Sequence, residues 1–111
     1  MPVHSRSSTL VTICLENTEA LQLAMPLILS FAAVGSPPCV LFDAEQPGLI
    51  SAVPSQNQQL DQLTEFGVSE IFTNEHAKLY LERLCPALTM VTIDAARIRT
   101  LHTQAHAIYA F

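Results

Sequence analysis

Residues 68–86, VSEIFTNEHAKLYLERLCP, contain the signals for a strand, a helix start, a helix and a helix stop. Ile71 and Phe72 suit a half-buried β-strand. Asn74 is a preferred N-cap, because its side chain accepts a hydrogen bond from a backbone N–H that the first helical turn leaves unpaired. Pro86 cannot continue a helix. The segment therefore predicts a strand that leads directly into a helix.

The apolar residues of this helix follow the helical period. Ala77, Leu81 and Leu84 fall at i, i+4 and i+7, with Tyr80 beside them. Such spacing places them on one stripe of the helix, and a stripe of this kind packs against a core. We expect the helix to cover one face of a sheet.

The same alternation of strand and helix continues through the chain. Apolar, β-rich runs predict four more strands at 9–15, 39–44, 88–93 and 106–111. Helical patterns predict three more helices at 20–34, 55–66 and 94–105. Alternating strands and helices produce a parallel sheet covered by helices, with right-handed crossovers. We therefore expect one α/β domain over residues 1–111, with a five-stranded, mainly parallel sheet in three layers and a flavodoxin-like topology, and with residues 1–8 flexible.

The segment at residues 20–34, ALQLAMPLILSFAAV, is apolar on nearly every side of the predicted helix. It is too short to span a membrane, which takes roughly 20 apolar residues. A helix in this kind of fold buries one stripe, so not all of its large apolar residues can face inward, and a chain this small offers no second layer. The residues in question are Met25, Leu29 and Phe31 on one side and Leu21, Ile28 and Ala32 on the other. We expect another copy of the chain, or a related subunit, to cover the exposed side.

Composition excludes several classes of function. The net charge is −5 with five Lys and Arg residues, so no basic stripe is available for nucleic acid. The three cysteines form no C-x-x-C pair, so neither a disulfide framework nor a zinc site is indicated. Free cysteines fit the reducing cytoplasm best. The chain has three glycines and no glycine-rich phosphate loop. We expect no metal and no cofactor.

Polar residues gather where the predicted strands end. Asp43 and Glu45 follow the second strand, and Asn74, Glu75 and His76 follow the third. Ligands of open α/β sheets bind at the carboxyl ends of the strands, so these five residues are candidates for a ligand site. Asp43 and Glu45 form an acid/base pair in one interpretation, and in the other they are acidic side chains solvated beside a turn.

Two segments and the order of the predicted elements carry a resemblance to a known family. The segments are FGVSEIFTNEHAKLYLERL, from Phe66, and the closing DAARIRTLHTQAHAIYAF with its terminal aromatic residue. The chain resembles the DsrE/DsrF family of small sulfur-relay proteins, and within it the DsrF/TusC type of subunit. The resemblance implies a DsrE/F-like fold and an assembly of two, three or six subunits. It also implies a role in passing persulfide sulfur between proteins, in tRNA thiolation or in sulfur oxidation.

The chain departs from the sulfur-carrying members of that family at one position. In the DsrE/TusD type the reactive cysteine lies just after the third strand, and the corresponding residues here, Phe72 to Asn74, include no cysteine. The resemblance therefore implies a non-catalytic or accessory subunit that acts by protein–protein binding. The alternative is a small enzyme or ligand-binding protein that uses Asp43, Glu45 and His76.

The cysteines and two of the histidines are further candidates for site residues. Cys14 and Cys39 lie in predicted strands and are expected to be buried. Cys85 lies beside Pro86 and is expected to be better exposed, but the helix C-terminus disfavours its thiolate, so it is a minor candidate for a sulfur carrier. His102 and His106 are four residues apart. They would form half of a metal site if the last helix continued, and otherwise they contact solvent or backbone carbonyls.

Overall fold

A computed structural model describes residues 9–17, 19–45 and 55–111, with residues 55–59 described as helix but without their side chains. Its centre is a five-stranded sheet in the order β4-β3-β2-β1-β5. Every pair of neighbouring strands runs parallel. The expected flexibility of residues 1–8 lies outside the described residues. The strands are β1 (Thr9–Cys14), β2 (Cys39–Asp43), β3 (Ile71–Thr73), β4 (Val91–Thr92) and β5 (Ala107–Ala110).

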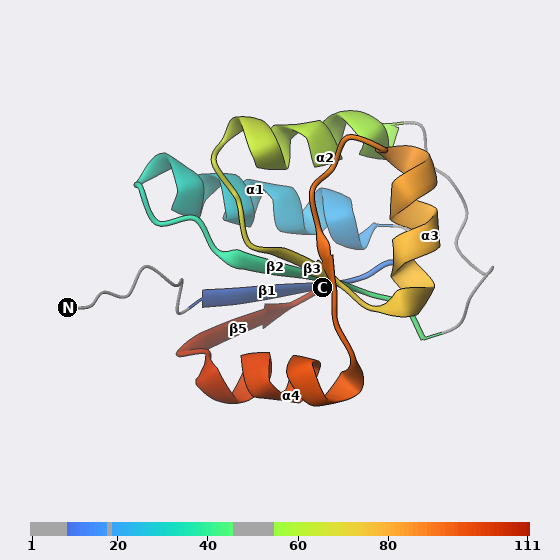
Figure 1. Cartoon of the computed structure of the whole chain (residues 1–111). Helices are drawn as coiled ribbons and strands as arrows, with labels where there is room; N and C mark the ends of the chain where they lie inside the picture. The colour runs from blue at the N-terminus through green and yellow to red at the C-terminus, as the bar shows by residue number, and fades with distance from the viewer. Residues whose placement is uncertain (1–8, 18, 46–54) are drawn as a thin grey trace.

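Helices cover both faces of this sheet (Figure 1). They are α1 (Ala20–Ala33), α2 (Ser55–Glu65), α3 (Glu75–Leu84) and α4 (Ala95–Gln104). The predicted fold class is therefore confirmed: the chain forms a three-layer α/β fold of flavodoxin-like type, with a parallel sheet of five strands.

The distribution of the helices follows from the strand order. From β1 to β4 the chain steps in one direction across the sheet, and right-handed crossovers place the helices of such steps on the same face. Side chains of α1, α2 and α3 accordingly share one core cluster with the sheet. The last connection runs back across the sheet to β5, beyond β1, and α4 lies on the opposite face (Figure 1).

The two faces of the sheet are not equally filled. The face under α1, α2 and α3 contains the larger cluster, which includes Val11, Ile13 and Phe42. The face under α4 contains four buried residues, Leu10, Cys39, Leu41 and Ile93. None of the residues of α4 is buried, although Ile98 and Leu101 pack against this smaller cluster. The α4 layer is therefore the thinner of the two.

Two helix starts agree with the sequence. The side chain of Asn74 accepts a hydrogen bond from the Ala77 N–H at 2.9 Å, and that of Asp94 accepts one from the Arg97 N–H at 2.9 Å. Both residues are N-caps, as predicted. The stripe of α3 is also confirmed, since Ala77 and Leu81 are fully buried.

The expectation that no other part of this chain covers α1 was wrong. Met25 is buried together with Leu21 and Ile28, and Leu29 and Phe31 are half-buried. The reason is that α2 packs against α1 in the same layer, so this chain does supply a neighbour for the helix. The large apolar residues that remain exposed near this helix are Leu23 and Val34.

The fourth strand is shorter than its apolar run. Residues 88–93 were expected to form the strand, and β4 pairs with β3 only at Val91 and Thr92. At one end of the run, Leu88 packs in the larger cluster without pairing with β3. At the other end, Ile93 packs in the smaller cluster, and its N–H donates to the Thr73 carbonyl at 2.9 Å just beyond the strand. Burial of these two side chains explains the apolar run, while the ladder itself stays short.

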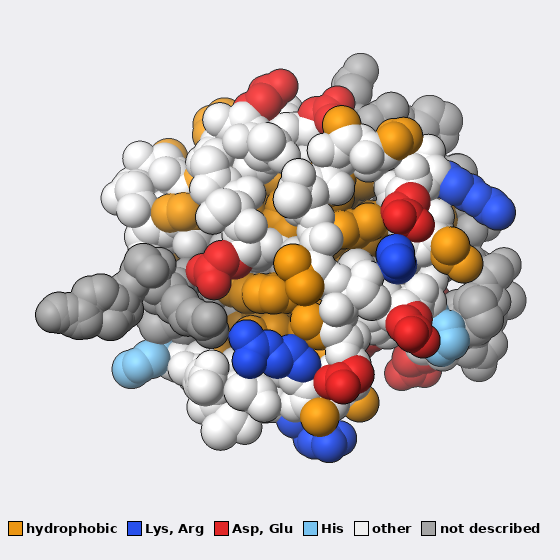
Figure 2. All heavy atoms as spheres, in the orientation of Figure 1, with side chains coloured by type: hydrophobic (Ala, Val, Ile, Leu, Met, Phe, Trp, Pro, Cys, Tyr) orange, Lys and Arg blue, Asp and Glu red, His pale blue; other side chains and the backbone are white. Residues whose placement is uncertain are grey.

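The surface separates charged from apolar regions on the face drawn in Figure 2. Charged side chains gather there on the side of α3, and an apolar area lies at the level of the sheet, between the helices above it and α4 below (Figures 1 and 2).

Within the described part of the chain, no helix combines the length and the apolar character needed to cross a membrane.

Candidate functional site

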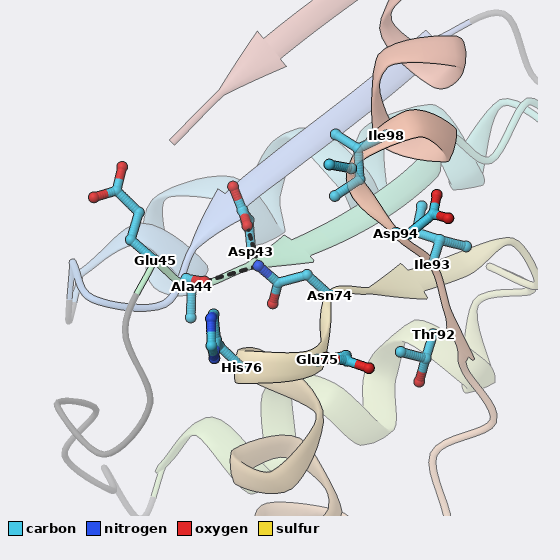
Figure 3. A pocket seen from close by; sticks show the side chains of 11 residues that line it. Asp43, Ala44, Glu45, Asn74, Glu75, His76, Thr92, Ile93, Asp94 and Ile98 are labelled. Atoms are coloured by element: carbon cyan, nitrogen blue, oxygen red, sulfur yellow. Dashed lines mark hydrogen bonds between the residues drawn. The ribbon is translucent and has the colours of Figure 1, made fainter.

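A pocket of about 720 Å³ opens where β2, β3 and β4 end and where α3 and α4 begin (Figure 3). The chain leaves β3 toward one face of the sheet and leaves β4 toward the other, so the two connections diverge and leave a crevice between them. The pocket therefore occupies a topological switch point. Its lining residues are Asp43, Ala44, Glu45, Asn74, Glu75, His76, Thr92, Ile93, Asp94, Ala95 and Ile98.

Asn74 fastens the start of α3 to the end of β2. Its Nδ2 donates hydrogen bonds to Asp43 Oδ1 and, at 2.7 Å, to the carbonyl of Ala44. Its Oδ1 accepts from the Ala77 N–H at the helix start. Both donor hydrogens and the acceptor oxygen of the amide are thus engaged (Figure 3). Asn74 shapes the pocket and has no donor left for a ligand.

Asp43 and Glu45 do not converge as an acid/base pair. Asp43 is half-buried and accepts the hydrogen bond from Asn74. Glu45 is exposed, and in Figure 3 its carboxylate points away from the other labelled side chains. The backbone N–H of Glu45 donates to Glu16 Oε1 at 2.9 Å, which fixes the chain where it leaves β2. Both residues line the pocket, but the geometry does not join them in one proton transfer.

Glu75 and His76 come from the first turn of α3 and are both exposed. The Glu75 side chain points toward Thr92 across the pocket, while His76 lies on the side of Ala44 (Figure 3). All five residues predicted at the carboxyl edge therefore line a single pocket.

The residue pattern did not predict the wall that β4 and α4 provide. Thr92, Ile93 and Ile98 line the pocket, and so does Asp94, which was predicted only as a helix cap. The sequence did contain a signal for Asp94. Asp94 follows the apolar run of the fourth strand, in the same way that Asp43 lies at the end of the second. The apolar members could not be distinguished from core residues by pattern alone.

The charge of the pocket limits what it can bind. Among the described residues that line it, four are acidic, namely Asp43, Glu45, Glu75 and Asp94, and none is Lys or Arg. This arrangement favours a cationic or neutral ligand and opposes an anionic one. Among the described residues, no three His, Cys, Asp or Glu side chains are grouped so as to hold a metal ion.

The expectation that Cys85 is the better exposed thiol was wrong. Cys85 is only 3% exposed and packs within the larger core cluster. Its Sγ donates a hydrogen bond to Asp61 Oδ1 at 3.2 Å. Burial raises the pKa of the Cys85 thiol, and the Asp61 carboxylate raises it further. Both effects oppose the thiolate that sulfur transfer requires.

The other two thiols differ in exposure. Cys39 is buried, as predicted, whereas Cys14 is half-buried and ends β1 at the carboxyl edge of the sheet. Cys14 lies in register with Asp43, and its Sγ is 3.7 Å from Glu16 Oε1. The prediction of a fully buried Cys14 was wrong. Cys14 is the last residue of β1, and a strand end is less covered by neighbouring side chains than the middle of the strand.

The two C-terminal histidines do not share a helical face. The helix α4 ends at Gln104, so His106 lies beyond it. His102 is exposed, and its Nδ1 is 2.9 Å from the carbonyl oxygen of Ile98. The interpretation as a helix-end pair near solvent and a backbone carbonyl fits this geometry.

The sequence matches no protein-family model and no curated protein.

Proposed function

We propose that this chain is a non-catalytic or accessory subunit of a persulfide-relay type of complex, and that it acts by binding related subunits or further copies of itself. The proposal starts from the resemblance to the DsrF/TusC type of subunit. Its main support is that residues 72–74 include no cysteine, whereas the sulfur-carrying DsrE/TusD type has its reactive cysteine just after the third strand. All hydrogen-bonding groups of the Asn74 amide serve the fold.

The remaining thiols support a role without sulfur chemistry. Cys85 is buried with a raised thiol pKa, and Cys39 is buried in β2. Cys14 is only half-buried, but its Sγ lies 3.7 Å from Glu16 Oε1. In the described part of the chain, no cysteine lines the pocket at the carboxyl edge.

Incubation with a persulfide donor, followed by intact-mass measurement, tests this role. The purified protein should largely keep its mass, because Cys39 and Cys85 are buried and Cys14 is only partly exposed. A stoichiometric gain of sulfur would contradict the proposal and place the chain among the carriers.

A second candidate function is the binding of a small cationic or neutral ligand. The observation that favours it is the meeting of Asp43, Glu45 and His76 in one pocket, which the alternative interpretation of the sequence requires. The separation of the two carboxylates argues for binding rather than for proton transfer.

An NMR titration with spermidine as a cationic probe and inorganic phosphate as an anionic probe tests this second function. Spermidine should shift the amide signals of His76 and Asp94, and phosphate should not. A Glu75→Gln change should weaken the spermidine shifts, whereas Glu82→Gln on the same helix, outside the pocket lining, should leave them unchanged. Phosphate shifts at the starts of α3 and α4, without spermidine shifts, would contradict the charge argument.

A further inference from the structure

The last strand is exposed along most of its length. β5 consists of Ala107–Ala110, and only Ala107 is half-buried. Ile108 is 43% exposed and Tyr109 is 39% exposed. Strands of a parallel sheet are normally covered on both faces. Within the described part of the chain, β5 is therefore an apolar parallel strand without the usual cover on both faces.

The outer edge of β5 also presents backbone groups. Phe111 donates its N–H to the Thr12 carbonyl and accepts from the Cys14 N–H, both at 2.9 Å, so its backbone faces β1. Backbone groups alternate in direction along a strand, and those of Ile108 and Ala110 accordingly point away from β1. No described strand pairs with that side of β5.

Apolar side chains flank this edge on both faces of the sheet. Tyr109 is in register with Val11 and lies on the face of α1, where its ring centroid is 5.9 Å from that of Phe31. Ile108 is in register with Leu10 and lies on the face of α4. A strand that paired with β5 would bury apolar side chains on both faces at once.

The charge distribution identifies the kind of partner. No Asp, Glu, Lys or Arg occurs in residues 20–34 or 100–111, which supply α1 and β5. Edge strands are commonly protected from pairing by charged side chains, and β5 has none. A basic partner would be attracted to the acidic carboxyl edge instead. A second copy of this chain also has a net charge of −5, so two copies repel each other wherever their carboxylates meet. Pairing at an uncharged edge avoids this repulsion, because no carboxylates are brought together.

From these observations we propose that β5 is a self-association edge, at which two copies pair their β5 strands antiparallel across a two-fold axis. The axis is perpendicular to the sheet, so Tyr109 and Phe31 of one copy meet the same residues of the other on one face. Ile108 meets its counterpart on the opposite face. Pairing of this kind is isologous and closes at two subunits, giving one continuous ten-stranded sheet from two five-stranded ones. The inference goes beyond the proposed function and holds whether or not the complex handles sulfur.

The opposite edge of the sheet is the competing surface. β4 has only two residues in the ladder, and Val91 is 55% exposed. The apolar area at the level of the sheet in Figure 2 is bordered by charged side chains of both signs. A two-residue strand offers fewer backbone hydrogen bonds than β5, so we place the contact at β5.

Sedimentation velocity of the full chain at tens of micromolar, in parallel with matched variants, tests the proposal. The wild type should sediment as a dimer, with twice the 12.1 kDa mass of one chain. Ile108→Lys should shift it to the monomer, because each copy then carries an unpaired charge into the contact. Ala110→Pro should do the same, because it removes an outward N–H without removing a hydrogen bond to β1. Val91→Lys, an exposed aliphatic residue at the other edge, should remain dimeric.

Circular dichroism of each variant separates loss of pairing from loss of fold. A monomeric wild type at these concentrations would overturn the proposal. A second contrary result is a dimer that persists in folded Ile108→Lys and Ala110→Pro but dissociates in Val91→Lys or Leu23→Lys. The contact would then lie at β4 or on α1.

Discussion

Asn74 connects three parts of the molecule through one side chain. It holds Asp43 and the Ala44 carbonyl at the end of β2, and it caps α3 through the Ala77 N–H. The cap could be predicted, because an asparagine before an apolar helix is a local signal. The two bonds to β2 could not, because they depend on which strands become neighbours.

Replacing Asn74 by alanine should lower the free energy of unfolding by about 2 kcal/mol, since it removes a cap and leaves a carbonyl oxygen without its partner. Asp94→Ala is the matched control, because Asp94 caps α4 through one bond to the Arg97 N–H. Its cost should be only about 1 kcal/mol. Equal losses in urea unfolding would show that the bonds to β2 contribute nothing.

The cysteines should differ in reactivity according to their exposure. Cys14 is half-buried, whereas Cys39 and Cys85 are buried, so iodoacetamide should modify Cys14 first in the native protein. Peptide mapping after short labelling measures this order. Modification of Cys85 before Cys14 would contradict the packing of Cys85 in the core.

The raised pKa of Cys85 also predicts a dependence of stability on pH. A thiol whose pKa is higher in the folded than in the unfolded chain favours folding below the unfolded value, about 8.5. That contribution is lost as the pH rises through the folded value. The free energy of unfolding should therefore fall more steeply above about pH 8.5 in the wild type than in Cys85→Ala. Parallel pH profiles for the two proteins would refute the assigned shift.

At the scale of elements, hydrophobic periodicity predicted which side of a helix is buried. The stripe of α3 was correct, since Ala77 and Leu81 face the core. The length of β4 was not, because an apolar residue of the run can be buried without pairing with β3, as Leu88 is. The neighbour of α1 was also missed, because the polar pattern of α2 does not reveal which helix its buried leucines contact.

Leu81→Ala should cost about 2–5 kcal/mol of unfolding free energy, the range for emptying a buried leucine site. Leu79→Ala on the same helix is the control, because Leu79 is 63% exposed. Its effect should stay within about 0.5 kcal/mol. Similar losses for the two variants would mean that the stripe of α3 does not face the core.

For the whole molecule, the alternation of strands and helices was sufficient to predict a parallel sheet with helices on both faces. The position of the candidate site followed as well, because the carboxyl ends of neighbouring strands meet at one edge. The wall of β4 and α4 required the strand order, which puts β4 beside β3 and sends the next helix to the other face. The open edge at β5 likewise depends on that order.

Intact mass after exposure to a persulfide donor tests most directly the proposal that this chain binds partners without carrying sulfur. Wild-type protein and the variants Cys14→Ser and Cys85→Ser should retain their starting masses. The exception is a minor, slowly formed fraction in the two proteins that keep the partly exposed Cys14 thiol. A rapid, stoichiometric gain of one sulfur in the wild type, abolished by one of the two substitutions, would contradict the account and identify the carrier.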